Sequence, residues 1–317
     1  HQGLKYMFQM MNEARIGVGF GAAVIGYRGY MHSLEYAKDR LQGRKASEKN
    51  PESPQAPIID HADVRRMLLA QKAYSEGGLA LCLYGARLMD DQHTHPDEQK
   101  RMEAGKLLDL LTPVIKAWPS EFGPKANDLA IQVYGGAGYT REYPVEQCWR
   151  DNRLNPIHEG TNGIQALDLL GRKIWQDQSH GLQLLMQEMQ VDLQAATTDR
   201  CQQWALSLSE TLQQAVKVTQ SLGKSLMGGE VDKTLANASC YLHLFGHIIV
   251  AWMWLRQANA AANALASANS DSERNFYQGK LQAAQYFFHW ELPTVAQDLV
   301  LLRNQDDTCL NMKADWF

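Results

Sequence analysis

The sequence has little of what marks several classes of protein. Its five cysteines are scattered, with no CxxC pair and no regular spacing, a pattern that predicts free thiols in a reducing compartment such as the cytoplasm. The formal net charge is only −4, so charge gives no general reason to expect nucleic acid as a partner. No signal peptide is visible near His1. A helical pattern begins there at once, and we therefore expect the chain to start within a longer protein.

Alternating strand patterns are also nearly absent. Long segments rich in Ala, Leu, Met, Gln and Glu have apolar residues at helical spacing instead. The expected fold class is therefore all-α, and 317 residues are enough for two domains. The polar run "QDQSHG" (176–181) divides the chain into predicted domains at 1–177 and 178–317. We expect three or four long helices in the second domain, with breaks near 223–231 and 267–273.

Capping and proline signals predict two helix boundaries in the first domain. Asp60 is a plausible N-cap for a helix that runs to about Asp91. A later helix is expected to end near Trp118, with Pro119 at the start of another, because proline is favoured in the first turn of a helix.

Two features suggest a membrane span or a metal site, and both have simpler explanations. The apolar run Tyr241–Leu255 is about 15 residues long, shorter than the ~20 that a spanning helix needs, so a buried core helix is expected and membrane contact is not. His243 and His247 are four residues apart, but the glutamate of an HExxH zinc motif is absent. We therefore predict no metal.

The segment "QVYGGAGYTREYP" (132–144) is rich in glycine. It is not a dinucleotide-binding GxGxxG motif, because the residues before it have helical rather than strand character. One interpretation is a tight turn with positive φ at Gly135 or Gly136. The other is a backbone left exposed so that a phosphate or a ring can lie against it. Taken alone, the pattern favours the turn.

Arg15 lies in the otherwise apolar stretch "MMNEARIGVGF". A buried arginine needs a carboxylate or a phosphate partner, so Arg15 is either half of a helix–helix ion pair or part of an anion site. Arg40 and Gln42 lie near the end of the same helix, where a cation also complements the helix dipole.

Glu159, in "NPIHEGTNGIQ", has two interpretations that spacing leaves evenly balanced. It is an acid two residues before Thr161, a predicted N-cap, where a negative charge suits the helix dipole. It also meets the needs of a base that removes a proton from carbon, which must be partly desolvated and must face its substrate. Gly160 leaves room for a ligand, and Ile157 and Ile164 supply apolar surroundings.

Three segments together resemble the acyl-CoA dehydrogenase family. In chain order they are "NEARIGVGFGAAVIGYRGYMHSLEYAKDRLQGRK", "QVYGGAGYTREYPVEQCWRD" and "IHEGTNGIQ", which is similar to the family's "YEGT…IQ" signature. The 27 residues from Gln132 to Glu159 also agree with the family pattern. The resemblance covers about residues 1–175. The remainder resembles larger bacterial members with an additional C-terminal helical domain, such as the 3-methylmercaptopropionyl-CoA dehydrogenase-like subgroup.

The resemblance implies a fold and a reaction. The fold is the helical bundle of the family's C-terminal domain, followed by a second helical domain. Glu159 is implied to be the base that removes the α-proton of an acyl-CoA thioester, while the β-hydrogen passes as hydride to N5 of FAD and trans-2-enoyl-CoA forms. In the family, the glutamate's own backbone N–H and a flavin hydroxyl stabilise the negative charge on the thioester oxygen.

The resemblance also assigns the other site residues. Asn12, Arg15 and Gly160 correspond to positions near the substrate thioester. Contacts to FAD are implied for Arg40, Gln42, Gln132, Gly135, Gly136, Thr161 and Gly163, and Arg40 and Gln42 reach the cofactor of a neighbouring subunit in the family. His158 departs from the family, which often has tyrosine before the base, and this leaves the acyl chain length open.

The implied partners are an acyl-CoA substrate, an electron-transfer flavoprotein or similar acceptor, and a second copy of the chain in a homodimer. Two alternatives remain. One is an acyl-CoA oxidase, in which oxygen meets the reduced flavin. The other is a non-catalytic protein of the same fold that binds a partner such as DNA. DNA binding requires a basic surface, whereas residues 175–317 carry 9 Lys and Arg against 14 Asp and Glu. Alone, the chain is expected to be inactive.

Overall fold

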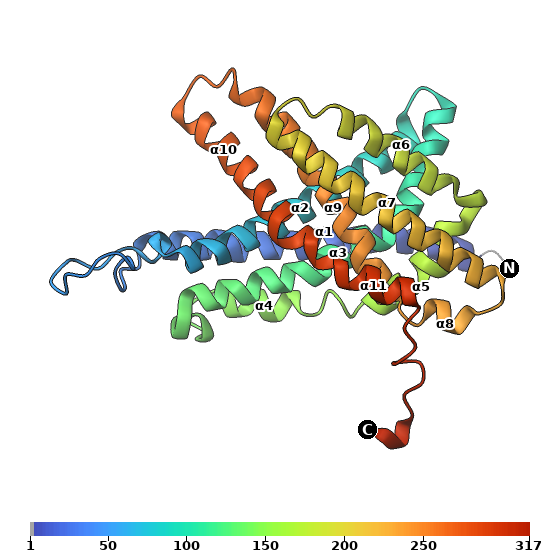
Figure 1. The fold of residues 1–317 in the computed structure, drawn as a ribbon, viewed down its shortest axis with the longest axis horizontal. Coiled ribbons are helices and arrows are strands. Elements are labelled where there is room, and N and C mark those ends of the chain that lie inside the picture. Colours follow the sequence, from blue (N-terminus) through green and yellow to red (C-terminus); the bar gives the residue numbers. More distant parts are fainter. Residues whose placement is uncertain (1–2) are drawn as a thin grey trace.

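The computed structural model describes residues 3–317, and in that range it is built from helices with no named β-strand. One isolated antiparallel bridge joins Leu41 to Pro57, across the loop after the first helix. The predicted all-α fold class is confirmed. Figure 1 shows long helices packed against each other, with a loop projecting at one end and the C-terminal segment leaving the body at another side.

The first half of the chain forms a bundle around three long helices. They are α1 (Gly3–Asp39), α2 (Ala62–Thr94) and α3 (Glu98–Tyr134), and two shorter helices follow, α4 (Val145–Asn152) and α5 (Asn162–Gly171). Short helical turns at Ile58–Asp60 (η1) and Gly135–Tyr139 (η2) precede α2 and follow α3. The predicted N-cap at Asp60 is wrong, because Asp60 ends η1 and His61 occupies the N-cap position of α2.

Helices α1 and α3 run parallel and in close contact. Gly19 lies against Ile115, and ten residues later Gly29 lies against Asn127. Both helices therefore end on the same side of the molecule. There the rings of Tyr36 and Tyr134 stack with their centroids 4.1 Å apart.

Helix α3 is continuous through three prolines, Pro113, Pro119 and Pro124. The predicted break between Trp118 and Pro119 is therefore wrong. Each proline removes one backbone hydrogen bond, but α3 is covered by α1, α2 and α9 and is fully buried from residue 111 to residue 120. Tertiary packing maintains the helix where the local signal predicts an end.

The second half consists of six further α-helices in chain order. They are α6 (His180–Gln194), α7 (Asp199–Met227), α8 (Val231–Leu235), α9 (Ala238–Leu265), α10 (Asp271–Tyr286) and α11 (Ala296–Asn304). A π-helical turn (Phe287–Glu291, η4) and a 3₁₀ turn (Leu292–Val295, η5) join α10 to α11, and a last turn (η6) covers Ala314–Trp316. The predicted breaks near 223–231 and 267–273 are confirmed.

Helix α9 is the centre of this half and also touches the first. It packs on α2, α3, α5, α7 and α10. By length and composition, this one helix of the described residues is apolar enough to cross a membrane, but 83% of the apolar window is buried inside the protein. One hydrophobic core extends through both halves. The segment Lys173–Ser179 (η3) that joins them contains a kink with positive φ at Asp177, Gln178 and Ser179. The division at 177/178 stays a prediction.

Candidate functional site

Glu159 lies in the loop that joins α4 to α5. Helix α5 begins directly after it, and the side chain of Thr161 accepts a hydrogen bond from the backbone N–H of Ile164 at 3.3 Å. The predicted N-cap at Thr161 is confirmed, and the helix that it caps ends at Gly171. The cap fixes the direction in which the loop enters α5, and so fixes the C-terminal end of the Glu159 turn.

The backbone at Glu159 is in an unusual conformation. Glu159 has φ of +55° and Gly160 has φ of +86°, both in the left-handed region, which is unfavourable for a residue with a side chain. The buried Gln165 supports this turn, because its Nε2 donates to the carbonyl oxygens of Glu159 and Gly160, each at 3.3 Å. Strained backbone of this kind persists where the surroundings impose it, and it gathers at functional sites.

Two groups of Glu159 are free to meet a ligand. Its side chain is half-buried, and its carboxylate has no hydrogen-bond or ion-pair partner among the side chains that the structure describes. No acceptor is present for its backbone N–H within residues 3–317. Unpaired backbone donors are uncommon away from water, so this N–H is available for an oxygen of a bound molecule.

Arg15 of α1 lies beneath this turn and forms an ion pair with a residue of α5. Its Nη1 is 3.4 Å from Oδ2 of Asp168 in α5, and both side chains are largely buried. The helix–helix ion pair considered from the sequence is therefore present. A side chain on Gly160 would approach Arg15 Nη2 to 3.9 Å, so the guanidinium also lies beside the Glu159 turn. Its Nε has no partner in the described part of the chain. Asn12, half-buried, is one turn earlier on the same helix face.

A second cation, Lys116 of α3, lies under the same loop. Its side chain is fully buried, and Nζ donates to the carbonyl oxygen of Asn155 at 2.8 Å and to Oδ1 of Asn162 at 3.4 Å. Burial and the nearby charge of Arg15, opposed by the charge of Glu159, together lower the pKa of Lys116 to about 8. Sequence reasoning missed Lys116. The signal was a single lysine in the apolar run "LLTPVIKAWP".

The residues around Glu159 on the outer side are apolar and exposed. Ile157 and Ile164 are 52% and 50% exposed, so within this chain they flank the carboxylate without covering it. His158 is half-buried, and its Nδ1 is 3.1 Å from the carbonyl oxygen of Leu154. Thr161 and Gly163 are exposed on the same surface.

The other predicted site residues gather at the opposite end of α1 and α3. Arg40, Gln42, Gln132, Gly135 and Gly136 are all exposed. The predicted positive φ is found at Gly135, at +62°. A methyl group on Gly135 or Gly136 would meet no atom within 4 Å, so this backbone is open to an incoming molecule. In Figure 1 this end includes the loop after α1, on the left of the view.

The structure therefore divides the predicted residues into two groups. Arg15, beside Glu159, is 24 residues before Asp39, the last residue of α1, which corresponds to about 36 Å along the helix. We name the two groups the base site (Asn12, Arg15, Glu159, Gly160, Thr161, Gly163) and the distal cradle (Arg40, Gln42, Gln132, Gly135, Gly136).

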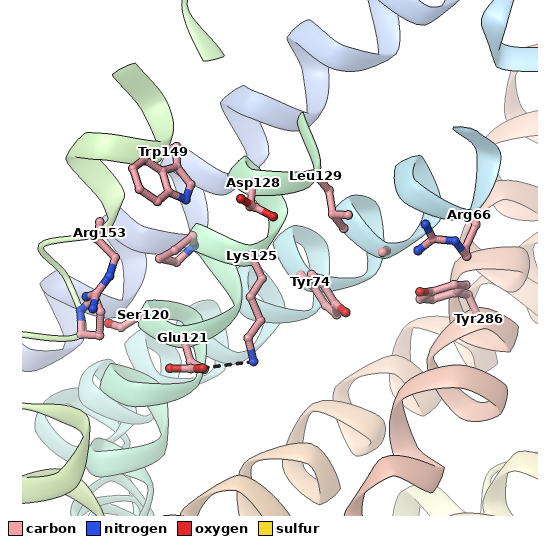
Figure 2. Close-up of a pocket in the computed structure, with 13 residues that line it drawn as sticks. Arg66, Tyr74, Ser120, Glu121, Lys125, Asp128, Leu129, Trp149, Arg153 and Tyr286 are labelled. Atoms are coloured by element: carbon pink, nitrogen blue, oxygen red, sulfur yellow. Dashed lines mark ion pairs between the residues drawn. The ribbon is translucent and has the colours of Figure 1, made fainter. Parts of the chain in front are cut away.

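A pocket of about 540 Å³ opens elsewhere, between α2, α3, α4 and α10. Figure 2 shows its mixed lining, which includes Arg66, Tyr74 and Trp149, and the ion pair between Glu121 and Lys125, 3.0 Å apart. No predicted site residue lines it. Volume alone does not identify the place of chemistry, and the assignments below depend on Glu159.

Residues 3–317 contain no group of three or more His, Cys, Asp or Glu side chains placed to hold a metal ion. The two histidines of α9 have other partners. His243 Nδ1 lies 2.6 Å from Oδ2 of Asp298, and His247 Nδ1 lies 3.0 Å from the carbonyl oxygen of His243.

Residues 1–175 match the family model of the acyl-CoA dehydrogenase C-terminal domain. Residues 185–313 match a model described as acetyl-CoA dehydrogenase C-terminal like. The chain belongs to the acyl-CoA dehydrogenase family.

Curated relatives match nearly the whole chain. The broad-specificity linear acyl-CoA dehydrogenase FadE5 of Mycobacterium tuberculosis is 32% identical over 98% of this chain and 52% of its own length. The 3-methylmercaptopropionyl-CoA dehydrogenase of Ruegeria pomeroyi is 33% identical over 90% of this chain and 48% of its own. The chain thus spans about half the length of these relatives.

Solved structures share the fold. An acyl-CoA dehydrogenase complexed with FAD from Bacillus anthracis has a TM-score of 0.72 at 19% identity, over 95% of this chain and 50% of that one. The Caenorhabditis elegans protein ACDH-11, in complex with C11-CoA, has a TM-score of 0.73 at 17% identity, over 91% and 44%. At these identities the likeness concerns the fold.

Proposed function

We propose that this chain supplies the catalytic base of an FAD-dependent acyl-CoA dehydrogenase, and that Glu159 is that base. The observation that carries the proposal is the Glu159 turn, in which a strained backbone presents a carboxylate and an N–H that have no partner in the described chain. A residue that only capped α5 would not need the left-handed conformation, because Thr161 already caps the helix.

The chemistry assigned to this chain is removal of a proton from the carbon next to an acyl-CoA thioester. The Glu159 carboxylate takes that α-proton, and its backbone N–H donates to the thioester oxygen as negative charge develops there. FAD, when bound, accepts the β-hydrogen with its electron pair. The product is a trans-2-enoyl-CoA. Arg15 and Lys116 place two positive charges beneath the loop that carries this carboxylate.

The exposed residues of both groups fit FAD. The distal cradle offers a guanidinium at Arg40, which has no side-chain partner among the described residues, and a glycine backbone without covering atoms. These suit phosphates and a flat adenosine group. Thr161 and Gly163 expose the start of α5 beside Glu159, where a polar cofactor group meets a helix N-terminus.

The distance between the two groups supports a homodimer. About 36 Å of helix lies between the base site and the distal cradle, so we propose that the cradle serves the FAD of a neighbouring copy, while the base site serves the chain's own. We also propose that the electrons pass to an electron-transfer flavoprotein or a similar acceptor, and that the enzyme is cytoplasmic.

The experiment uses the full-length protein with a panel of acyl-CoA thioesters of different chain lengths, with and without polar groups. Enoyl-CoA formation coupled to an electron-transfer acceptor supports the dehydrogenase, and turnover with oxygen alone indicates an oxidase. If no thioester in the panel bleaches the flavin, the proposal fails. The 317-residue chain alone is expected to bind little FAD and to be inactive, because it spans only about half the length of the relatives that it matches.

A further inference from the structure

One buried cation joins the two ends of the loop that carries Glu159. Asn155 lies before the turn and Asn162 after it, and Lys116 Nζ donates to the carbonyl oxygen of the first and to the side chain of the second, at 2.8 and 3.4 Å. The six residues between these asparagines include the two with positive φ. The loop therefore closes over a single ammonium group.

The surroundings make this contact hard to replace. Lys116 is fully buried in α3, between Pro113 and Pro119. Removing the donor of a buried carbonyl oxygen costs more free energy than a typical hydrogen bond contributes to stability, because the oxygen is then left without any partner. Asn155 is also held from behind, because its Nδ2 donates to Oδ1 of Asn152 at 2.8 Å. The N-terminal end of the loop is thus fixed by a series of buried hydrogen bonds that links Lys116, Asn155 and Asn152.

Three charged groups face Lys116 or its partners from the elements packed on it. Arg15 approaches from α1, and Glu159 approaches from the loop. Glu121, one turn later on α3, has its Oε2 3.4 Å from Nδ2 of Asn162. The charges of Arg15 and Glu159 thus act on the ammonium group in opposite directions.

We infer that Lys116 is a positioning residue for the base, which holds the loop from Asn155 to Asn162 in the one conformation that presents the Glu159 carboxylate and N–H together. This inference rests on the proposed role of Glu159. Lys116 itself touches no substrate. It acts through the loop, so its loss should lower the rate of proton removal more than it weakens acyl-CoA binding.

The lowered pKa of Lys116 predicts a pH dependence of the rate that a purely structural role of this side chain would not produce. Burial brings the pKa of Lys116 to about 8, so its charge is lost as pH rises through that value. A neutral amine still has donors, but its hydrogen bonds are weaker than those of an ammonium group. The rate of the full-length enzyme should therefore fall above about pH 8.

The test compares Lys116→Met, Lys116→Arg and Lys173→Met in the full-length enzyme. Lys173 is a matched control, since it too is a buried lysine, paired with Asp109 of α3 and away from the Glu159 loop. We expect kcat of Lys116→Met to fall about 100-fold, the effect of a small misplacement of a catalytic group, with a change in KM of less than about threefold and FAD content like that of Lys173→Met. Lys116→Arg keeps the charge, recovers part of kcat, and moves the alkaline fall to higher pH.

Hydrogen exchange provides a readout without turnover. Peptides that cover residues 155–162 should exchange faster in Lys116→Met than in Lys173→Met, with α3 equally protected in both. Equal exchange in the loop, or a kcat no lower than that of Lys173→Met, overturns the inference. If Glu159→Gln also keeps its rate, the proposed function fails with it. If Glu159→Gln is inactive, only the role of Lys116 fails.

Discussion

Gly19 of α1 lies directly against the carbonyl oxygen of Ile115 in α3, and a Cβ at residue 19 would overlap that oxygen and approach the Ile115 carbonyl carbon to 2.9 Å. In a regular helix this oxygen would accept a bond from residue 119, but Pro119 has no N–H. The oxygen is thus free of its helical partner where the two helices touch. The contact places Arg15, one turn earlier, beneath the Glu159 loop.

Gly19→Ala should therefore separate the two helices and destabilise the chain by about 2 kcal/mol, a typical cost of overpacking. Gly17→Ala is the control, because a Cβ there meets nothing within 4 Å and alanine favours a helix over glycine by about 1 kcal/mol. Chemical unfolding of both variants provides the measurement. Equal effects on the two variants would show that the helices do not touch at Gly19.

Gly160→Ala should strain the base site. Gly160 has φ of +86°, and a Cβ there would lie 2.7 Å from Nε2 of Gln165, the group that holds the turn. We expect a loss of about 1–2 kcal/mol in unfolding free energy from the backbone conformation and a larger fall in turnover. Gly163→Ala, whose Cβ would be at 3.8 Å from Thr161 Oγ1, should be nearly neutral in stability. A stable Gly160→Ala enzyme with full turnover would argue against the observed turn.

Acid should destabilise the chain partly through His247. Burial, assisted by the neighbouring His243, lowers the pKa of His247 from 6.5 to about 3. Between these values the unfolded chain binds a proton that the folded chain does not, so this contribution to stability is complete above pH 6.5 and is lost as pH falls toward 3. His247→Gln removes the titrating group. Unfolding free energies measured across this range should depend less steeply on pH in the variant than in the wild type, and identical slopes would refute the assignment.

Arg40→Ala tests the distal cradle. Loss of one charge-assisted contact to a phosphate should weaken FAD binding about tenfold without changing the melting temperature of the FAD-free protein, because Arg40 is exposed. Arg87→Ala, an exposed arginine of α2 outside both residue groups, serves as the control. Flavin titration of the full-length variants measures the effect. Unchanged affinity in Arg40→Ala would remove this residue from the FAD site.

Local signals predicted much of this architecture. The spacing of apolar residues indicated the long helices, and a hydroxyl side chain before "NGIQ" indicated the cap at Thr161. Positive φ was predicted at Gly135 or Gly136, and it is found at Gly135. Each of these three features depends on a few residues that are neighbours in the sequence, so the sequence alone is enough to predict it.

Other features depend on partners that are distant in the sequence. The continuity of α3 through Pro119 depends on α1 at Gly19, about 100 residues earlier. The role of Lys116 depends on a loop about 40 residues later, and Arg15 finds its carboxylate 153 residues away. Periodicity carries no information on such pairs. The positive φ of Glu159 also gives no local signal, since it is imposed by Gln165 and the loop ends.

The direct test of the central claim is the rate of flavin reduction in full-length Glu159→Gln, measured in a single turnover with an acyl-CoA substrate. Glutamine keeps the shape and the backbone N–H but cannot take the proton. The account predicts normal FAD content, normal acyl-CoA binding and a rate at least ~10³-fold below wild type, within the range for a general base. Flavin reduction within a few-fold of wild type would contradict it.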